Sequence, residues 1–400
     1  MARKEKHRTA RFELEPDGFS IHTFELWRQL THEKYQEIRE YLYSMNDQEK
    51  KPCTYPNAQE NIVCRAFSEN GIGITLEGTN HDADKNDSKY CCYGLRIFVS
   101  PRRLLEPETS YLGILEPEET SVDTLKEKFK ELFSGTPIPK KLKKYTATRV
   151  DLCTNIRCDN KKLFREMVRV IRKLPTPPKY QRKLRKTNTS GMSEKEKKAA
   201  IRADNKYNKH YFKVSCGICD LVIYDKGYQI TAEGLEEIGY DDLPNSVLRF
   251  ECRLLRKLLR DEEAQYSLAN CVDLLKHLIN CSRTILTGRF ERYFAEEPFC
   301  RFEEIEKRIE KSSYNRTIKD TMLEFSELIR RAQSVDSVFE KMEKGKRKFE
   351  RKELLNRFKE LGINPIPLWN NFCAEQLPSP VTLLKGVAQG EIEVDYIIVK

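Results

Sequence analysis

The sequence predicts an α+β protein in which small antiparallel sheets carry helices on one face, followed by an α-helical C-terminal domain. Stretches with alternating apolar and polar residues recur up to Leu255, amphipathic helical patterns separate them, and strand patterns nearly vanish afterwards. We expect an N-terminal α+β half at residues 1–144, a second α+β half at 145–257 with a basic insertion at 179–209, and the helical domain at 258–400.

The first half is predicted from short local patterns. A turn at Asn70-Gly71 joins two strands of a hairpin, and Thr31 is placed to cap a helix. The expected elements are a strand in Phe19–Glu25, a helix in Thr31–Ser44, the hairpin Ile62–Phe67 with Ile72–Leu76, a strand in Tyr90–Val99 and a helix in Ser121–Phe133.

The second half repeats this element order, although no residue-level repeat is visible. It comprises a strand in Thr148–Ile156, a helix in Asn160–Leu174, a hairpin in Tyr211–Tyr228 and a strand in Ser246–Leu254. Beyond it we expect helices in Glu262–Ile285, Phe302–Ile309, Thr317–Met342 and Phe349–Leu361, and a closing strand in Ile392–Val399.

The strand Thr148–Ile156 carries an unusual acidic residue. Val150 and Leu152 fall on one face of the strand, whereas Asp151 falls on the other. Asp is a poor strand former, and a half-buried strand offers it little water. We therefore expect a cation, a hydrogen-bond partner or a metal to compensate Asp151.

Two later strands alternate in the same way, so the three strands can share a sheet with one apolar face. The opposite face then collects carboxylates, a tyrosine and cations: Asp151, Asp220, Glu251, Tyr224, Lys226, Arg149, Arg249 and Arg253. One interpretation is a solvated face held by cross-strand ion pairs. The other is a functional site.

Composition bounds the function. The formal net charge is +10, which is compatible with a nucleic-acid partner. No apolar run approaches the roughly 20 residues that span a bilayer, and the charged N-terminus is no secretory signal, so we expect a cytoplasmic protein without membrane contact. The 13 cysteines suit reduced, buried thiols, and Cys216 and Cys219 form a lone CxxC without a second pair for zinc. P-loop, GxGxxG, GxSxG and paired-histidine metal motifs are absent from the sequence.

The insertion at 179–209 is the most basic stretch, with eleven Lys or Arg against three acidic residues. We expect a mobile loop or a loosely attached helix. It is either a solvated insertion or an arm along a phosphate backbone, whose candidate contacts are Lys179, Arg182, Lys183, Arg185 and Lys186, with Arg149 of the central strand.

Three motifs in order resemble the landmarks of rolling-circle replication initiators of plasmids and filamentous phages. They are Thr148-Arg149-Val150-Asp151, Ile223-Tyr224-Asp225-Lys226 and Leu248-Arg249-Phe250-Glu251-Cys252-Arg253. The resemblance covers roughly residues 145–257 and implies a duplicated RRM/HUH-like nicking core. It does not extend to the C-terminal helices.

This resemblance implies a metal-dependent endonuclease that nicks origin DNA and forms a 5′-phosphotyrosine. Asp151 and Glu251 would hold Mg²⁺ or Mn²⁺, Lys226 and Arg249 would face phosphate, and Tyr224 is the first candidate nucleophile. Tyr228 and Tyr207 are the other candidates, and Tyr224 could instead be a packed ring bonded to a carboxylate.

The implied partners are origin DNA, partly single-stranded or hairpin, and a host helicase or a second copy of the chain. The alternatives are a DNA-binding protein that does not cut, consistent with Phe250 and the missing histidine pair, or an RNA-binding protein.

Overall fold

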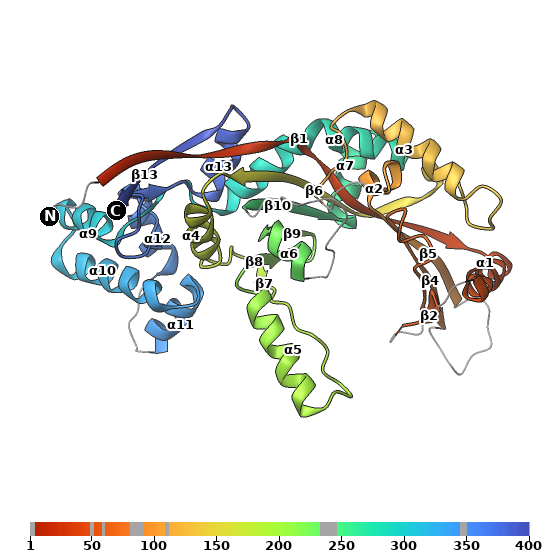
Figure 1. Ribbon diagram of the computed structural model, residues 1–400, viewed down its shortest axis with the longest axis horizontal. Coiled ribbons are helices and arrows are strands. Elements are labelled where there is room, and N and C mark those ends of the chain that lie inside the picture. Colours follow the sequence, from red (N-terminus) through yellow and green to blue (C-terminus); the bar gives the residue numbers. More distant parts are fainter. Residues whose placement is uncertain are drawn as a thin grey trace.

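A single long strand, β1 (Glu5–Leu30), runs through the middle of an 11-stranded sheet in the computed structural model (Figure 1). The structure describes residues 5–48, 52–57, 61–80, 91–108, 112–232, 246–344 and 350–399. The strand order is β2-β3-β4-β5-β1-β6-β10-β9-β8-β7, and every pairing between these strands is antiparallel. An antiparallel α+β fold is therefore confirmed.

The strands on the two sides of the β1–β6 pair follow mirrored orders. One side holds β2 (Thr54–Pro56), β3 (Ile62–Cys64), β4 (Ile72–Asn80) and β5 (Cys91–Val99) beside β1. The other side holds β7 (Gln181–Arg182), β8 (Tyr211–Ser215), β9 (Cys219–Asp225) and β10 (Val247–Leu255) beside β6 (Thr146–Cys158).

Helices cover the apolar face of the sheet. The long α8 (Cys271–Tyr293) packs the ring of Phe290 on Phe250 of β10, and Ser282 of α8 donates a hydrogen bond to the Phe19 carbonyl of β1. Helix α3 (Glu119–Leu132) lies beside α8, and α4 (Lys161–Ile171) packs against β6 and β9. Val150, Leu152 and Phe250 are fully buried here, as their alternation predicts.

The remaining helices complete both halves. They are α1 (His32–Ser44), which Thr31 caps as predicted, α2 (Pro101–Leu105), α5 (Glu194–Tyr207), α6 (Lys226–Ala232) and α7 (Arg256–Gln265). Gly71 closes the β3–β4 hairpin with φ +71°, and a Cβ there would lie 2.7 Å from that of Arg103. Glycine is required at this turn.

The C-terminal region is mostly helical and returns to the sheet. Its helices are α9 (Phe302–Lys311), α10 (Arg316–Arg331), α11 (Val335–Lys344), α12 (Arg351–Glu360) and α13 (Pro380–Val387). Strands β11 (Phe299–Cys300) and β12 (Gln376–Leu377) pair with each other. The last strand, β13 (Ile392–Val399), pairs with β1, so the predicted closing strand is confirmed and both chain ends lie at one end of the sheet (Figure 1).

Several predicted elements need correction. The stretch Glu262–Ile285 is not one helix, because Asn270 caps the start of α8 after α7 has ended. Thr317–Met342 is likewise divided into α10 and α11. Lys226 does not continue its strand but opens α6. Tyr90 and Phe349, predicted to begin a strand and a helix, lie outside the described residues.

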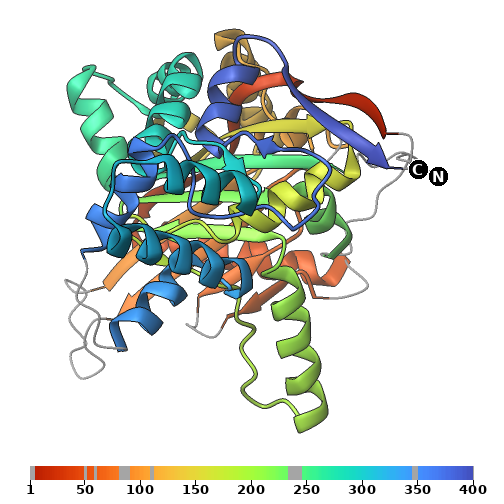
Figure 2. The ribbon, with the colours of Figure 1, turned by 90° about the vertical axis from the view of Figure 1, so that its left-hand side faces the viewer.

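The basic insertion contains a helix, as the second of the two expected forms predicts, and we call residues 179–209 the arm. It leaves the sheet at β7, extends to α5, and returns into β8, so that α5 projects from the body in two perpendicular views (Figures 1 and 2). A capping box between Ser193 and Glu196 fixes the start of α5.

Candidate nucleic-acid interface

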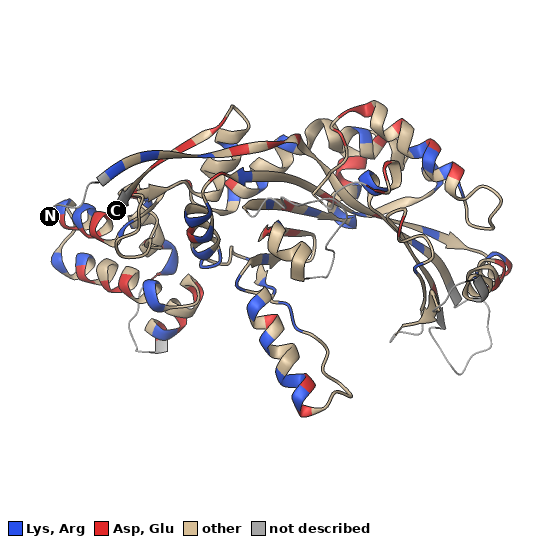
Figure 3. Cartoon of the chain, in the orientation of Figure 1, with Lys and Arg blue, Asp and Glu red and all other residues tan. Residues whose placement is uncertain are grey.

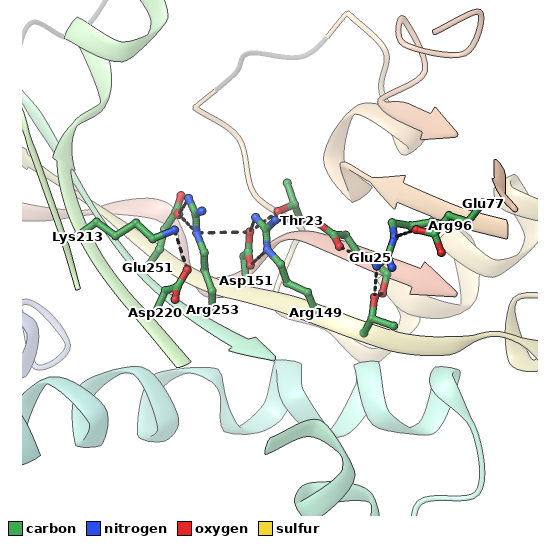
Figure 4. A network of polar contacts seen from close by, with 11 residues as sticks. Thr23, Glu25, Glu77, Arg96, Arg149, Asp151, Lys213, Asp220, Glu251 and Arg253 are labelled. Atoms are coloured by element: carbon green, nitrogen blue, oxygen red, sulfur yellow. Dashed lines mark hydrogen bonds and ion pairs between the residues drawn. The ribbon is translucent and has the colours of Figure 1, made fainter. Parts of the chain in front are cut away.

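Charged side chains cross the face of the sheet opposite α8, and Figure 4 shows them in a row. The first pair joins Lys213 Nζ of β8 to Asp220 Oδ2 of β9 at 2.7 Å. A second run crosses β10, β6, β1, β5 and β4 through these residues: Glu251, Arg253, Asp151, Arg149, Glu25, Arg96 and Glu77. We call these nine residues the charge ladder. Its five acids and four cations nearly cancel, so the ladder itself offers phosphate little attraction.

Asp151 lies at the centre of the charge ladder and is only 1% exposed. Its carboxylate accepts two hydrogen bonds from the Arg149 guanidinium, one from Nε to Oδ1 at 2.7 Å and one from Nη2 to Oδ2. It also accepts a hydrogen bond from the Thr23 hydroxyl at 2.6 Å. Arg149 also donates to Glu25 Oε1 at 2.8 Å. The predicted compensation for Asp151 is therefore a cation and a hydroxyl, and Arg149 is engaged by two carboxylates.

Glu251 is the second buried carboxylate, also 1% exposed. The Tyr224 hydroxyl donates to its Oε1 at 2.6 Å, Arg253 Nη2 donates to Oε2 at 2.8 Å, and His22 Nδ1 lies 3.3 Å from Oε1. Burial alone would raise the pKa of Glu251, but Arg253 and His22 hold that pKa well below its usual value. Glu251 is therefore ionised.

Tyr224 and His22 share this enclosed environment. Burial, and then the charge of Glu251, raises the pKa of Tyr224 well above its usual value. Burial lowers the pKa of His22 to about 4, so His22 is neutral at pH 7. His22 lies at the β1–β6 register shift between Ile21 and Thr23, on the face opposite the buried Ile21.

Arg249 and Lys226 do not face open solvent, contrary to the phosphate-facing role that the resemblance implies. Arg249 is 0% exposed; its Nε donates to Asn155 Oδ1 at 2.7 Å and its Nη2 donates to the Leu112 carbonyl. Lys226 is buried and donates to Gln229 at 2.9 Å. Arg249 thus connects β10 to β6 and to the segment at Leu112, whereas the Lys226 hydrogen bond lies within α6.

Asp151 and Glu251 do not form a metal-ligand set in this arrangement. Both carboxylates are satisfied by side-chain donors, and Arg253 lies between them, 3.8 Å from Asp151 and 2.8 Å from Glu251. Among the described residues, no group of three His, Cys, Asp or Glu side chains is placed to hold a metal ion. Mg²⁺ and Mn²⁺ prefer several oxygen ligands, and the oxygens of these two carboxylates are already engaged by protein donors.

Tyr211, at the start of β8, is the functional candidate that sequence reasoning missed. It pairs with Tyr224 across β8 and β9, with ring centroids 5.8 Å apart, so it shares the face of the charge ladder. It is partly exposed, and no described residue hydrogen-bonds its hydroxyl. Burial raises the pKa of Tyr211, while the charge of Arg253 opposes that rise. The alternation of β8 predicts its face, because Phe212 and Val214 are the buried apolar residues of the strand and Tyr211 therefore falls on the opposite face.

Aromatic rings surround Tyr211 where the arm meets the sheet. Tyr207 lies 5.4 Å from Tyr211, and the ring of His210 stacks on Tyr228 at 3.8 Å. His210 Nδ1 is 3.0 Å from Asp225, and Arg185 lies 4.5 Å over the ring of Tyr207. We call Tyr207, His210, Tyr211 and Tyr228 the arm-root cluster. Stacked rings beside cations are typical of surfaces that bind unpaired bases.

The five predicted phosphate contacts of the arm divide into two groups. Arg182 is an anchor: it donates to the carbonyls of Arg172 and Leu174 and lies 4.5 Å over Phe212, and burial lowers its pKa to about 10. The other four, Lys179, Lys183, Arg185 and Lys186, are exposed.

The remaining findings concern the chain as a whole. No model of a known protein family matches this sequence, and none of the curated proteins does. No helix in the described ranges is long and apolar enough to cross a membrane. The eleven cysteines whose side chains the structure describes are free thiols.

Proposed function

We propose that this chain is a replication initiator of a plasmid, phage or integrative element, which binds origin DNA and cuts one strand with a tyrosine. The observation that carries the proposal is the position of Tyr211. Its partly exposed phenol lies on the face of the charge ladder, beside the arm-root cluster and the basic arm. A tyrosine, buried carboxylates and stacking rings thus occupy one region.

Tyr211 is a better nucleophile candidate than Tyr224. A nucleophile must reach the phosphorus atom, and Tyr224 is 4% exposed with its hydroxyl held by Glu251. In the proposed reaction the Tyr211 oxygen bonds to phosphorus, the phenolic proton passes to a base, and the bond to the 3′ oxygen breaks. The 5′ end of the strand stays on the protein, while the released 3′ oxygen takes up a proton.

The strand order supports the duplicated RRM/HUH-like core that the resemblance implies. Each half of the sheet places its first strand at the centre, its last strand next, and its three middle strands outward. The motif strands β6, β9 and β10 belong to the second half, and the arm is inserted there between β7 and β8. In this proposal the first half widens the sheet and the second half carries the chemistry.

The test uses supercoiled DNA that carries the protein's own coding region, with Mg²⁺, Mn²⁺ or EDTA. We expect open circles with covalently attached protein from wild type and Tyr224→Phe, and none from Tyr211→Phe. Equal cleavage by all three proteins would remove Tyr211 as the nucleophile. Salt-sensitive DNA binding without any nick or adduct, with either metal, would favour a DNA-binding protein that does not cut.

The other expected partners stay predictions. A host helicase or a second copy of the chain would be measured by co-purification and by sedimentation. Preference for single-stranded RNA over an origin hairpin at matched salt would favour the RNA-binding alternative.

A further inference from the structure

The positive charge of the chain is concentrated in the arm. Residues 179–209 carry eleven Lys or Arg and three acidic residues, a net charge of +8, whereas the whole chain carries +10. The other 369 residues therefore contribute only +2. Figure 3 shows this basic density on α5, which projects away from the body (Figure 2).

The exposed cations of α5 fall on one side of the helix. Lys195, Lys198, Arg202 and Lys206 are all exposed, and at 100° per residue they lie within an arc of about 80°. Lys209 extends the same line just beyond the helix. We call these five residues the α5 stripe. Within the part of the chain that the structure describes, none of the five has an ion pair with an acidic side chain.

The three acidic residues of the arm are engaged elsewhere. Glu194 pairs with Lys197 at 3.0 Å, and Glu196 completes the capping box with Ser193. Asp204 faces inward and accepts hydrogen bonds from the backbone and hydroxyl of Thr187 at 2.6 and 2.9 Å. The charge of the α5 stripe is therefore not neutralised by its own arm.

The arm is fixed to the sheet at several points, so the α5 stripe has a defined direction. Arg182 anchors its first segment, and the Lys183 amide donates to the Lys213 carbonyl at 2.9 Å. Asn208 and Arg185 exchange two hydrogen bonds, at 2.8 and 3.1 Å, across the base of the arm. Because the helix is formed and anchored before binding, little conformational entropy is lost on docking.

We infer that the α5 stripe binds duplex DNA, with α5 lying in the major groove next to the strand that is cut. The inference rests on the proposed function, in which DNA is the partner. A helix of 14 residues is about 21 Å long, close to six base pairs, and its diameter of about 10–12 Å matches the major groove. In this arrangement the cations of the α5 stripe contact phosphates. Asn205 and Ile201 lie beside the stripe and face the base edges; Asn205 is exposed, and Ile201 is 54% exposed.

Duplex DNA fits α5 better than a membrane or an RNA duplex. A membrane-surface helix needs a broad apolar face, and Ile201 is the only large exposed hydrophobic that the structure shows on α5. The major groove of an RNA duplex is too narrow for a helix. The arm thus distinguishes double-stranded DNA from both.

The experiment measures binding of full-length protein to a fluorescent 25-base-pair DNA duplex by anisotropy over a range of KCl concentrations. The test variant replaces Lys195, Lys198 and Arg202 with Ala. The matched control replaces Lys126, Lys128 and Lys130 of α3 with Ala, three lysines at the surface that each pair with acidic neighbours. A charge-keeping variant, Lys195→Arg with Lys198→Arg and Arg202→Lys, shows whether charge alone is required.

We expect the test variant to lose about 10- to 100-fold in duplex affinity, and the slope of log Kd against log salt to fall by about 2 to 3, close to 0.9 for each lost phosphate contact. The control and charge-keeping variants should bind like wild type. Unchanged Kd and slope in the test variant would overturn the inference. So would an equal loss of binding to duplex RNA or to vesicles of anionic lipid. If the wild-type protein binds duplex DNA through the α5 stripe but never cuts DNA, the proposed function is contradicted and the inference about α5 stands.

Discussion

The Tyr224 hydroxyl donates a 2.6 Å hydrogen bond to Glu251 Oε1 across the neighbouring strands β9 and β10. Both residues are buried, and Arg253 and His22 satisfy the rest of that carboxylate. The pair resembles part of a catalytic motif in sequence, but its geometry makes it a structural bond that positions Glu251. A phenol in this position is held away from substrate.

The structural role of Tyr224 predicts a stability effect. Replacing Tyr224 with Phe removes a hydrogen bond to a charged acceptor, which contributes about 1.5–3 kcal/mol. We expect the free energy of unfolding in urea to fall by that order. Tyr211→Phe is the matched control and should be near neutral, because no described residue bonds its hydroxyl. Equal stability of the two variants would contradict the role given to Tyr224.

Arg249 is predicted to stabilise the fold rather than to bind phosphate. Arg249→Met leaves Asn155 Oδ1 and the Leu112 carbonyl without their donor and Glu251 without a nearby buried cation. We expect a loss of about 3–5 kcal/mol in the free energy of unfolding. Arg157→Met, at a half-exposed arginine of β6 that pairs with Glu15, should cost less than about 1 kcal/mol. A stable Arg249→Met protein that has lost only DNA affinity would restore the phosphate-facing role.

His22 predicts a loss of stability at mildly acidic pH. Its pKa is about 4 in the folded protein, against 6.5 as the usual value, so the unfolded chain binds a proton first as the pH falls. The stability contributed by neutral His22 is full above pH 6.5 and is lost between pH 6.5 and 4. Between pH 6.5 and pH 4.5 the free energy of unfolding should fall by about 2–3 kcal/mol from this cause. Urea unfolding of wild type and His22→Gln should differ in pH slope over that window. Parallel slopes would show that His22 is not responsible.

Metal addition is predicted to leave the DNA-free protein unchanged. Arg149 and Arg253 already satisfy Asp151 and Glu251, so millimolar Mg²⁺ or Mn²⁺ should not raise Tm, and a metal requirement would be measured only in DNA cleavage. A rise of several degrees that Asp151→Asn abolishes would mean that the carboxylates form a metal site before DNA binds.

The faces of the strands could be predicted from the sequence because the strands alternate clearly, but their order and register could not. Small sheets were expected, whereas one large sheet forms around β1, of which only Phe19–Glu25 was predicted as a strand. The pairing of Asp151 with Arg253 and of Glu251 with Cys153 is set by the register between β6 and β10. Helix boundaries were less predictable: the division between α7 and α8 depends on Asn270, a cap inside a continuous polar and apolar pattern.

The site could be predicted only in part, because alternation gives the face of a residue but not its exposure. Arg249, Glu251 and Arg253 were correctly assigned to one face, yet Arg249 is covered by the segment at Leu112, which lies 137 residues away in sequence. Alternation places His22 on the face opposite Ile21, but its contact with Glu251 could not be predicted, since it depends on the order of β1, β6 and β10 in the sheet. Tyr211 has no distinctive motif, and only the pairing of β8 with β9 brings it beside Tyr224.

The most direct measurement identifies the tyrosine that carries DNA. The covalent adduct from the cleavage reaction would be digested with trypsin and nuclease, and the modified peptide sequenced by mass spectrometry. Trypsin separates the four candidates, because Lys209, Lys213 and Lys226 lie between successive members of the series Tyr207, Tyr211, Tyr224 and Tyr228. The account predicts a nucleotide on the peptide His210–Lys213, which contains Tyr211. Modification of the peptide Val214–Lys226 would place the nucleophile at Tyr224 and contradict the account.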